Sequence, residues 1–369
     1  MGDAWIAGKP ATLETAIAEA AAVLTASRQA LIAGLGTDIA GARAAIALAE
    51  RSGAVVDHMH SNVLLRDLDV IRSSGVMLTT PTETYVRADT LLVVGPMLEA
   101  GETELLQRLF GKLRSRRGQN SLERRIFWLC PGAEQATQQL SAVSAAAVGK
   151  EPKELPALAA ALRARMAGRA TGKAPVATNT LDEVLASLKA SRFGVAIWQS
   201  ETLDELTIEM MCGLVNDLNA TTRFSTLPLP SADNAIGVLQ TCGWMTGLPM
   251  RTGFGRGIPE HDPWRFDGTR LVESGETDCV VWISAYRAHA PLWRDPPPII
   301  ALTGRDAAFR TPPRVHIEVG RPGIDHAAVV HQSLTGTLTA VDAMHPSDAI
   351  STAEAIQRIS SALPEGRPC

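Results

Sequence analysis

The sequence predicts an α/β protein of two doubly wound, mainly parallel-sheet halves that are related by an internal repeat. The repeat is the first observation: an Ala-rich helical run that ends in Ala-Ser-Arg at 26–28 and leads into an apolar strand returns at 190–192. The strands are the second observation, because they are short continuous apolar runs and not alternating ones. Such runs are typical of parallel strands that helices cover on both faces.

The predicted elements of the two halves correspond in order. A helical pattern that opens at Thr12 and a second one that ends near Ser52 are answered by patterns that open at Thr180 and end near Leu218. The predicted strands correspond as follows: 30–33 with 195–198, 91–94 with 280–283, and 126–129 with 299–302. Because helical patterns lie between the strands, we expect right-handed βαβ connections.

The best candidate for a linker is the stretch 168–177, where Gly and Pro interrupt the periodicity. We therefore predict a first half over 1–167, a linker over 168–177 and a second half over 178–369. This division allows the C-terminal part of the second half to pack back on the first half. In a protein of two such halves, the cleft between them is the expected place for a site.

Composition narrows the function classes. The chain has 369 residues, of which 46% are hydrophobic and 20% charged, with a formal net charge of −4. These values are typical of a globular protein and do not favour a nucleic acid or a membrane surface as partner. No apolar run approaches the roughly 20 residues that span a bilayer. The five cysteines form no Cys-x-x-Cys pair, which indicates buried thiols and a cytoplasmic protein.

The segment 241–267 is predicted to be a long glycine-rich loop. Glycine and proline are frequent in it, and it also carries Trp244, Arg251, Arg256 and Trp264. Long ordered loops are uncommon in α/β proteins unless they contact something, and Trp and Arg suit an interface or an anionic ligand. The alternative is a crossover connection whose tryptophans cap the core.

This segment carries a resemblance to a known family. Its pattern is Gly243-x-x-x-Gly247-x-Pro249, then Phe254-x-Arg256-Gly257-x-Pro259 and Pro263. The pattern resembles the B subunit of formylmethanofuran dehydrogenase, of the molybdopterin oxidoreductase group, whose members bind a molybdenum or tungsten pterin between duplicated α/β domains. The chain also resembles the B subunits of formyltransferase/hydrolase complexes, which serve one-carbon oxidation with methanofuran-type and tetrahydromethanopterin cofactors.

Redox members of that group resemble one another in two cysteine features that this sequence lacks. One is an N-terminal cysteine cluster for an iron–sulfur centre, whereas the first cysteine here is Cys130. The other is a metal-ligating cysteine in the loop after the second strand. The corresponding stretch, 54–63, has no thiol, and we interpret its polar residues as a vestigial cofactor loop. These residues are His58, His60, Ser61 and Asn62.

The resemblance therefore implies a subunit that kept the fold and lost the redox centres. It would be a non-catalytic, structural and cofactor-docking subunit of a hetero-oligomeric complex for formyl transfer and formyl hydrolysis, in the conversion of formaldehyde to formate. The expected partners are an amidohydrolase-like subunit and a formyltransferase subunit. We predict no catalytic residue, no metal site and no cofactor at a redox site, and at most a methanofuran-type carrier at the level of the complex.

Two alternative functions remain open. The first is a redox-active molybdenum or tungsten formylmethanofuran dehydrogenase subunit. The second is a stand-alone Rossmann-type nucleotide-binding protein, suggested by Gly34, Gly36 and Gly41 at a strand-to-helix turn. The third glycine is displaced, and a tight turn with Asp38 near the helix start explains the pattern more simply. A metal pair at His58 and His60 is also less favoured than two polar residues at a strand exit, because no other histidine shows matching ligand spacing.

A cluster of cations stands out in a chain that is net acidic. Its members are Lys112, Arg114, Arg116, Arg117, Arg124 and Arg125. One interpretation is a solvated helix end. The other is a docking patch for a polyanion, because methanofuran-type cofactors, as the resemblance implies, carry a glutamate-rich tail that arginines attract. Arg251 and Arg256 form a second candidate pair for the same carrier.

Overall fold

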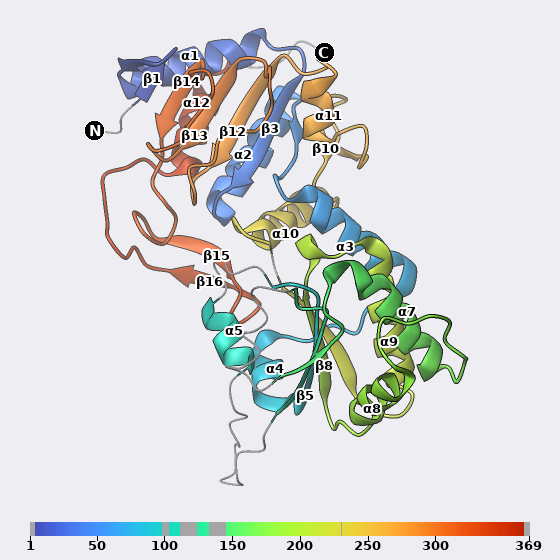
Figure 1. Cartoon of the computed structure of the whole chain (residues 1–369). Coiled ribbons are helices and arrows are strands. Elements are labelled where there is room, and N and C mark those ends of the chain that lie inside the picture. The colour runs from blue at the N-terminus through green and yellow to red at the C-terminus, as the bar shows by residue number, and fades with distance from the viewer. Residues whose placement is uncertain (1–3, 98–102, 111–123, 133–144, 230, 365–369) are drawn as a thin grey trace. The chain divides into compact units, whose positions relative to one another are not determined.

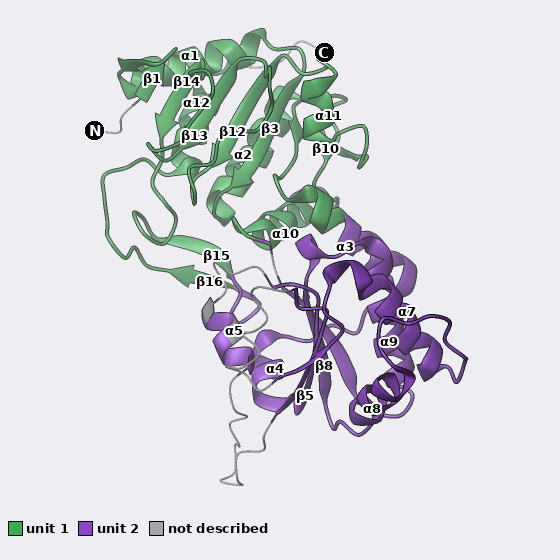
Figure 2. Cartoon of the chain, in the orientation of Figure 1, with its two compact units in different colours: residues 1–65, 232–331, 338–369 green, residues 66–231, 332–337 purple. Residues whose placement is uncertain are grey.

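Figure 1 shows the computed structural model of the chain, which describes residues 4–97, 103–110, 124–132, 145–229 and 231–364. The chain divides into two compact units (Figure 2). Unit 1 comprises residues 1–65, 232–331 and 338–369, and unit 2 comprises residues 66–231 and 332–337. Each unit contains a β-sheet with helices packed on it, so the predicted α/β class is confirmed.

The described residues form the following regular elements. The helices are α1 (Leu13–Ala26), α2 (Ile39–Ser52), α3 (Ser61–Ser74), α4 (Pro81–Arg87), α5 (Thr103–Phe110), α7 (Leu155–Met166), α8 (Thr178–Lys189), α9 (Glu205–Leu218), α10 (Ala235–Thr246), α11 (Gly268–Glu273) and α12 (Thr352–Ala362). The strands are β1 (Ala4–Ile6), β2 (Lys9–Ala11), β3 (Ala30–Gly36), β4 (Val55–Val56), β5 (Thr90–Val94), β6 (Arg125–Leu129), β7 (Ala146–Val148), β8 (Gly194–Gln199), β9 (Phe224–Leu229), β10 (Thr252–Gly253), β11 (Glu260–His261), β12 (Cys279–Ser284), β13 (Ile299–Thr303), β14 (Val315–Glu318), β15 (Ala328–Gln332) and β16 (Thr337–Val341).

The helix starts that the sequence predicts have side-chain caps. The Thr12 hydroxyl accepts a hydrogen bond from the N–H of Thr15, and the Asp38 carboxylate accepts one from the N–H of Gly41. These bonds satisfy backbone donors that the first helical turn leaves without a partner. The interpretation of Gly34–Gly41 as a tight turn with Asp38 at the helix start is thereby confirmed.

The sheet of unit 1 has nine strands in the order β11-β10-β4-β3-β12-β13-β14-β1-β2. The strands from β4 to β14 are parallel, and the strands outside them pair antiparallel. Alternate residues of a strand point to opposite faces. Ile32 accordingly packs with α1, α2, α10 and α12, whereas Leu31 packs with Leu271 of α11 on the other face.

Unit 2 has a wholly parallel sheet of five strands in the order β7-β6-β5-β8-β9. Helices α7, α8 and α9 cover one face, where Leu92 and Trp198 are buried. Helix α5 covers the other face, where Leu91 and Trp128 are buried. The continuous apolar runs of the sequence thus correspond to strands that are covered on both faces.

The two sheets share one plan. The central order β4-β3-β12-β13-β14 of unit 1 matches the order β9-β8-β5-β6-β7 of unit 2. The match includes a hydrogen bond at the end of each repeated helix. The N–H of Arg28 donates to Oδ2 of Asp278 over 2.9 Å, and the N–H of Arg192 donates to Oδ2 of Asp89 over 3.0 Å. The internal repeat of the sequence is therefore a repeat of strand order and of local contacts.

The division into units differs from the predicted boundary at 168–177, because the repeated halves exchange strands. β3 and β4 of the first half form one sheet with β12, β13 and β14 of the second half. β5, β6 and β7 of the first half form the other sheet with β8 and β9 of the second half. Residues 168–177 consequently lie inside unit 2, between α7 and α8.

The segment 241–267 is also more regular than predicted. Residues 241–246 complete α10, which ends at Gly247 in the left-handed conformation. Residues 252–253 and 260–261 form β10 and β11, which extend the sheet of unit 1 beyond β4. Among the helices that the structure describes, none is both long and apolar enough to cross a membrane.

Candidate functional site

The loop after β4 brings two histidines together at the carboxyl end of that strand. His58 is buried, its Nδ1 accepts the N–H of His60 over 3.0 Å, and its Nε2 has no hydrogen-bond partner among the described residues. Burial lowers the pKa of His58 to about 3, so its ring is neutral near pH 7. Nε2 of His60 lies 3.2 Å from Oδ2 of Asp233. The histidines therefore interact with each other and with one carboxylate.

Asp233 precedes α10 in a left-handed backbone conformation, with φ 57°. Its side chain is buried, and Nε of Arg287 lies 3.7 Å from its Oδ1. Burial opposes the ionisation of Asp233, but the hydrogen bond with His60 and the charge of Arg287 keep its pKa below the ordinary value. The carboxylate therefore stays ionised between two partners from different loops.

Arg251 ties the glycine-rich segment to the loop after β4. This residue has φ 62° and is only 8% exposed. Its guanidinium pairs with Asp267 and with Asp57, where Nε lies 3.5 Å from Oδ2, and it donates to Oδ1 of Asn62 and to the carbonyl of Pro263. Arg251 thus holds two carboxylates and an amide, and its own charge is neutralised inside the unit.

Asp57 is the most deeply buried acid of this network. Its Oδ2 accepts the N–H of Gly268, the first residue of α11, over 2.8 Å. Burial raises the pKa of Asp57 to about 6, although Arg251 lowers it. A carboxyl group with this pKa gains and loses its proton near pH 6, so the charge of Asp57 changes close to neutral pH.

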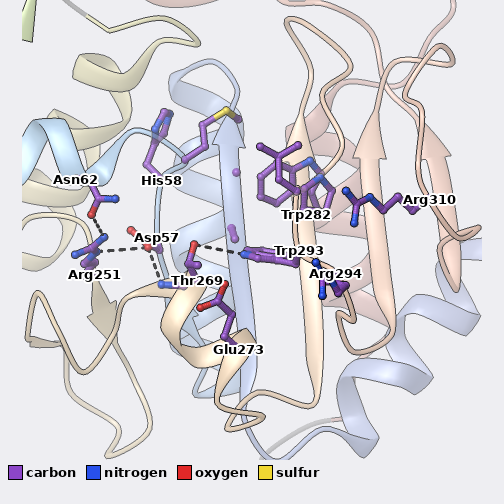
Figure 3. Close-up of a pocket in the computed structure, with 16 residues that line it drawn as sticks. Asp57, His58, Asn62, Arg251, Thr269, Glu273, Trp282, Trp293, Arg294 and Arg310 are labelled. Atoms are coloured by element: carbon purple, nitrogen blue, oxygen red, sulfur yellow. Dashed lines mark hydrogen bonds and ion pairs between the residues drawn. The ribbon is translucent and has the colours of Figure 1, made fainter. Parts of the chain in front are cut away.

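A cavity of about 560 Å³ lies beside this network in unit 1 (Figure 3). One part of its wall comes from β3 and from the loop after β4, and another comes from α11. The third part comes from the loops after β12 and β13, which supply Trp293, Arg294 and Arg310. In α/β sheets, ligands bind outside the carboxyl ends of the strands. The cavity has this position.

Aromatic side chains form the middle of the cavity wall. Trp282 of β12 and Trp293 meet edge to face, with ring centroids 5.4 Å apart and an interplanar angle of 80°. The indole N–H of Trp282 donates to the carbonyl of His289 over 2.6 Å, and that of Trp293 donates to Oγ1 of Thr269 over 3.4 Å. These bonds fix both rings, so the wall is preformed.

The structure brings together some of the residues that the sequence predicted. His58, Asn62 and Arg251 all line the cavity. Ser61 supports the loop, because its Oγ accepts the N–H of His58 over 3.0 Å. His60 lies next to them and points to Asp233. Within the described part of the chain, no group of three or more His, Cys, Asp or Glu residues is arranged to hold a metal ion.

Sequence reasoning missed the other side of the cavity. Trp282, Trp293, Arg294 and Arg310 were not predicted as site residues, yet they form its aromatic and basic wall. Their signal in the sequence is their position at or shortly after the carboxyl ends of two predicted strands. That signal becomes usable only when both strands are known to belong to the same sheet as β3.

The predicted cation cluster falls largely outside the described residues, which holds for Lys112, Arg114, Arg116 and Arg117. Arg124 is described, and its guanidinium donates to the carbonyls of Ala88, Leu109, Thr84 and Tyr85. Burial lowers its pKa to about 10. Arg124 therefore satisfies the carbonyl groups at the ends of α4 and α5.

The remaining candidates for carrier binding lie at the surface. Arg125 is exposed and donates to Oγ1 of Thr90 over 3.0 Å. Arg256 is exposed in the loop between β10 and β11, where its NH1 lies 3.2 Å from Oε1 of Glu260. Exposed pairs of this kind contribute little to stability, so both side chains are available to a ligand, unlike Arg251.

Comparison with known proteins assigns the chain to a family. The B subunit of the formyltransferase/hydrolase complex Fhc of Methylorubrum extorquens is 33% identical over 346 residues, which cover 93% of this chain and 92% of the relative. The chain belongs to this B-subunit family. A crystal structure of the Methylorubrum extorquens complex FhcABCD with methylofuran contains a chain that matches with a TM-score of 0.85 at 32% identity, over 97% of this chain and 98% of that one.

More distant relatives contain tungsten. The B subunit of the tungsten-containing formylmethanofuran dehydrogenase 2 of Methanocaldococcus jannaschii is 27% identical over 75% of this chain and 65% of the relative. The corresponding subunit of Methanococcus maripaludis is 26% identical over 77% of this chain and 67% of the relative. No family model matches the sequence. The predicted resemblance to both kinds of B subunit is confirmed.

The described thiols of this chain do not fit a thiolate-bound metal. The stretch 54–63 contains no cysteine. Burial raises the pKa of the Cys130 and Cys279 thiols to about 12 and that of Cys212 to about 11, and it also raises the pKa of Cys242. Because the thiolate is the form that ligates metals, these four described cysteines are unsuited to the task.

Proposed function

We propose that this chain is a non-catalytic, structural and carrier-docking subunit of a cytoplasmic complex for formyl transfer and formyl hydrolysis. The observation that carries the proposal is the similarity to the B subunit of the Methylorubrum extorquens complex, which extends over 93% of this chain and 92% of the relative. Similarity over nearly the full length of both proteins supports a common role in assembly. The fold alone would not support it, because one fold hosts many functions.

The chemistry of the described residues supports a non-redox role. The thiols are buried and stay protonated, and the buried Arg251 neutralises the carboxylates beside the loop that corresponds to the cofactor loop of redox relatives. In this proposal the formyl group is transferred by one partner and released as formate by an amidohydrolase-like partner. The present chain supplies surfaces and no reacting group.

The test is purification of the tagged full-length chain from its native source. We expect a formyltransferase and an amidohydrolase-like protein to co-purify in fixed ratios, and formyl hydrolysis to be lost from cell extract when the gene is deleted. A catalytically dead substitution in the amidohydrolase-like partner should abolish hydrolysis in the intact complex. Recovery of the chain as a monomer without these partners would contradict the proposal.

The redox-active alternative is favoured only by the more distant similarity to tungsten-containing subunits. Metal analysis of the native complex separates the two, because a stoichiometric amount of molybdenum or tungsten bound to this chain would support the dehydrogenase. Tight binding of NAD(H) by the purified chain would instead support the stand-alone nucleotide-binding protein. We expect neither result.

We further propose that a methanofuran-type carrier docks through arginines of this chain. The proposed residues are one lysine and seven arginines: Lys112, Arg114, Arg116, Arg117, Arg124, Arg125, Arg251 and Arg256. Arg124 and Arg251 would contribute while they keep their partners within the protein. Methylofuran is the ligand of the similar crystal structure. A tail with repeated carboxylates meets several cations at once, so small contributions accumulate.

The test of carrier docking is charge reversal in the assembled complex. We expect the triple change Arg114→Glu, Arg116→Glu and Arg117→Glu to release the carrier and to remove the salt sensitivity of its retention, since exposed charges are screened within about 10 Å at roughly 0.1 M salt. The matched control reverses three exposed cations of unit 2, Lys153, Arg169 and Lys189, with the same change in net charge. Equal retention in both variants would contradict the proposal.

A further inference from the structure

The cavity of unit 1 has a basic end that lacks a counter-ion. Arg294 and Arg310 come from the loops after β12 and β13, both are exposed, and both line the cavity. Neither forms an ion pair with any residue that the structure describes, whereas the nearby Arg305 pairs with Glu318 over 3.0 Å. Two guanidinium groups from separate loops in the wall of one cavity suit an anion, and a carboxylate above all, because the planar fork matches both carboxylate oxygens.

The opposite end of the cavity offers buried polar groups. His58 Nε2 and Asp57 Oδ1 are buried, line the cavity and have no hydrogen-bond partner among the described residues. Asp57 Oδ1 is an acceptor, whereas the neutral His58 ring, whose Nδ1 accepts the N–H of His60, carries its proton on Nε2 and is a donor there. Glu273 of α11 adds a carboxylate on the same side as Asp57 and Thr269 (Figure 3). Buried polar groups without partners are uncommon in proteins. A ligand amino group would satisfy both, because its N–H donates to Asp57 Oδ1 and its nitrogen lone pair accepts from the N–H of His58.

The tryptophans connect these two ends. Trp282 and Trp293 are held edge to face at 5.4 Å, and Figure 3 shows Trp293 between Thr269 and Arg294. A flat ring in the cavity would lie against fixed aromatic faces, which is a favourable contact of small conformational cost. The sequence of environments along the cavity is therefore polar, aromatic and basic.

We propose that this cavity binds an aromatic carboxylate that carries an amino group at the far end of its ring. The carboxylate pairs with Arg294 and Arg310, the ring packs on Trp282 and Trp293, and the amino group forms hydrogen bonds at the polar end. A simple inorganic anion would leave the buried acceptor without a donor, and a simple amine would leave both arginines without a counter-ion. The site lies within unit 1 alone, and it shares Arg251 with the residues proposed for carrier docking.

The experiment is calorimetric titration of the full-length chain, within its complex, with 4-aminobenzoate as the probe. Benzoate lacks the donor, aniline lacks the carboxylate, and inorganic phosphate supplies the anion alone. We expect 4-aminobenzoate to bind at one site. Benzoate and aniline should each bind at least about tenfold more weakly, because each loses hydrogen bonds to charged groups at one end of the cavity. Phosphate should not compete, because it lacks the ring that packs on the tryptophans.

Variants test the geometry. The double change Arg294→Gln and Arg310→Gln should weaken 4-aminobenzoate by about tenfold or more and leave the affinity for aniline unchanged. The matched control is Arg358→Gln on α12, an exposed arginine paired with Glu354 and outside the cavity wall. Trp293→Leu should weaken every ring-bearing probe. Absence of binding, equal affinity in the double variant, or competition by phosphate would overturn the proposal.

Discussion

The sheets of units 1 and 2 share a central strand order, and one matched pair of residues shows how their strand ends differ. The shared hydrogen bonds align Arg28 of unit 1 with Arg192 of unit 2. Six residues further along the chain, Gly34 therefore corresponds to Trp198. Gly34 has φ 78°, and the register of β3 against β12 shifts beside it. Trp198 instead continues the regular pairing of β8 with β5 and is 1% exposed.

The difference shows where the repeat has diverged. The strand order and the aspartate contact at the strand start are the same in both units, whereas the carboxyl ends of the strands are not. In unit 1 the irregular end of β3 lines the cavity beside Arg251. In unit 2 the corresponding position is filled by a large side chain that packs with α7 and α9. The sheets specify the fold, and the strand ends specify what each unit can bind.

The largest expected effect is in the core of unit 2. Trp198→Ala should lower the free energy of unfolding by about 3–5 kcal/mol, because it removes a buried aromatic ring and leaves a cavity. Urea denaturation measures the loss, and hydrogen exchange should place it in β5 and β8. An exchange pattern changed in β3 and β12 instead would show that the two units do not unfold separately.

The matched change in unit 1 acts through the backbone. In Gly34→Ala the new Cβ would lie 2.5 Å from the carbonyl oxygen of Ile283. We expect a loss of about 2–3 kcal/mol from this overlap and from the left-handed conformation, with the exchange of β3 and β12 affected. A neutral result would mean that β3 can adopt a regular path, and the comparison with Trp198 would fail.

The ion pairs of the two units should also differ in their contribution to the free energy of unfolding. Arg251→Met leaves the buried Asp57 and the partly buried Asp267 without this cation, and we expect a loss of about 3 kcal/mol. The matched change Arg165→Met in unit 2 breaks a half-exposed pair with Asp182, which is 2.8 Å long, and should cost less than about 1 kcal/mol. Denaturation midpoints of both variants at one pH give the comparison, and equal losses would contradict it.

The pH dependence of unit 1 should follow Asp57. Its folded pKa is about 6 because burial disfavours the carboxylate, whereas an unfolded Asp has a pKa of about 3.9. The folded state therefore binds the proton more tightly, so this stabilisation is full below about pH 4 and is lost as the pH rises through about 6. Asp57→Asn should remove up to about 3 kcal/mol of pH dependence. Urea denaturation between pH 4 and 7 measures it, and an equal pH dependence in the wild type and the variant would assign the effect to another group.

The smallest effect concerns the contact that both units share. Asp278 accepts the N–H groups of Arg28 and Gln29 over 2.9 and 3.2 Å and also the hydroxyl of Ser27. Asp89 accepts one N–H, that of Arg192 over 3.0 Å, and the hydroxyl of Thr90 over 3.1 Å. We expect Asp278→Ala to cost about 2 kcal/mol and Asp89→Ala about 1 kcal/mol. Denaturation measures both, and a larger loss for Asp89 would reverse the ranking of the two contacts.

Local features of the sequence predicted most elements and few of their long-range partners. The cap at Thr12 and the continuous apolar runs are local signals, so helices and strands were predicted close to their observed bounds. The apolar sequences of β3 and β8 look alike, however, and neither indicates which other strands it pairs with. Arg124 illustrates the same limit, since a cation in a charged cluster proved to bind the carbonyl groups of two helices.

The site was predicted in part for the same reason. His58, Asn62 and Arg251 stood out through residue type and through the family resemblance, and all three line the cavity. Trp293 and Arg310 lie beyond the glycine-rich segment in the order of the chain, on loops with no motif of their own. Only the placement of β12 next to β3, and of β13 next to β12, brings these loops into the same cavity wall as Asp57.

The exchange of strands between the repeated halves determines the order in which the two units can fold during synthesis. Nearly all of unit 2 is one continuous stretch, 66–231, which can fold as soon as it emerges. β3 must wait for its neighbour β12, which begins at Cys279. At about 5–20 residues per second this delay is on the order of 10–50 s. During that interval the apolar strand β3 is exposed, so nascent chains stalled before β12 should depend strongly on chaperones.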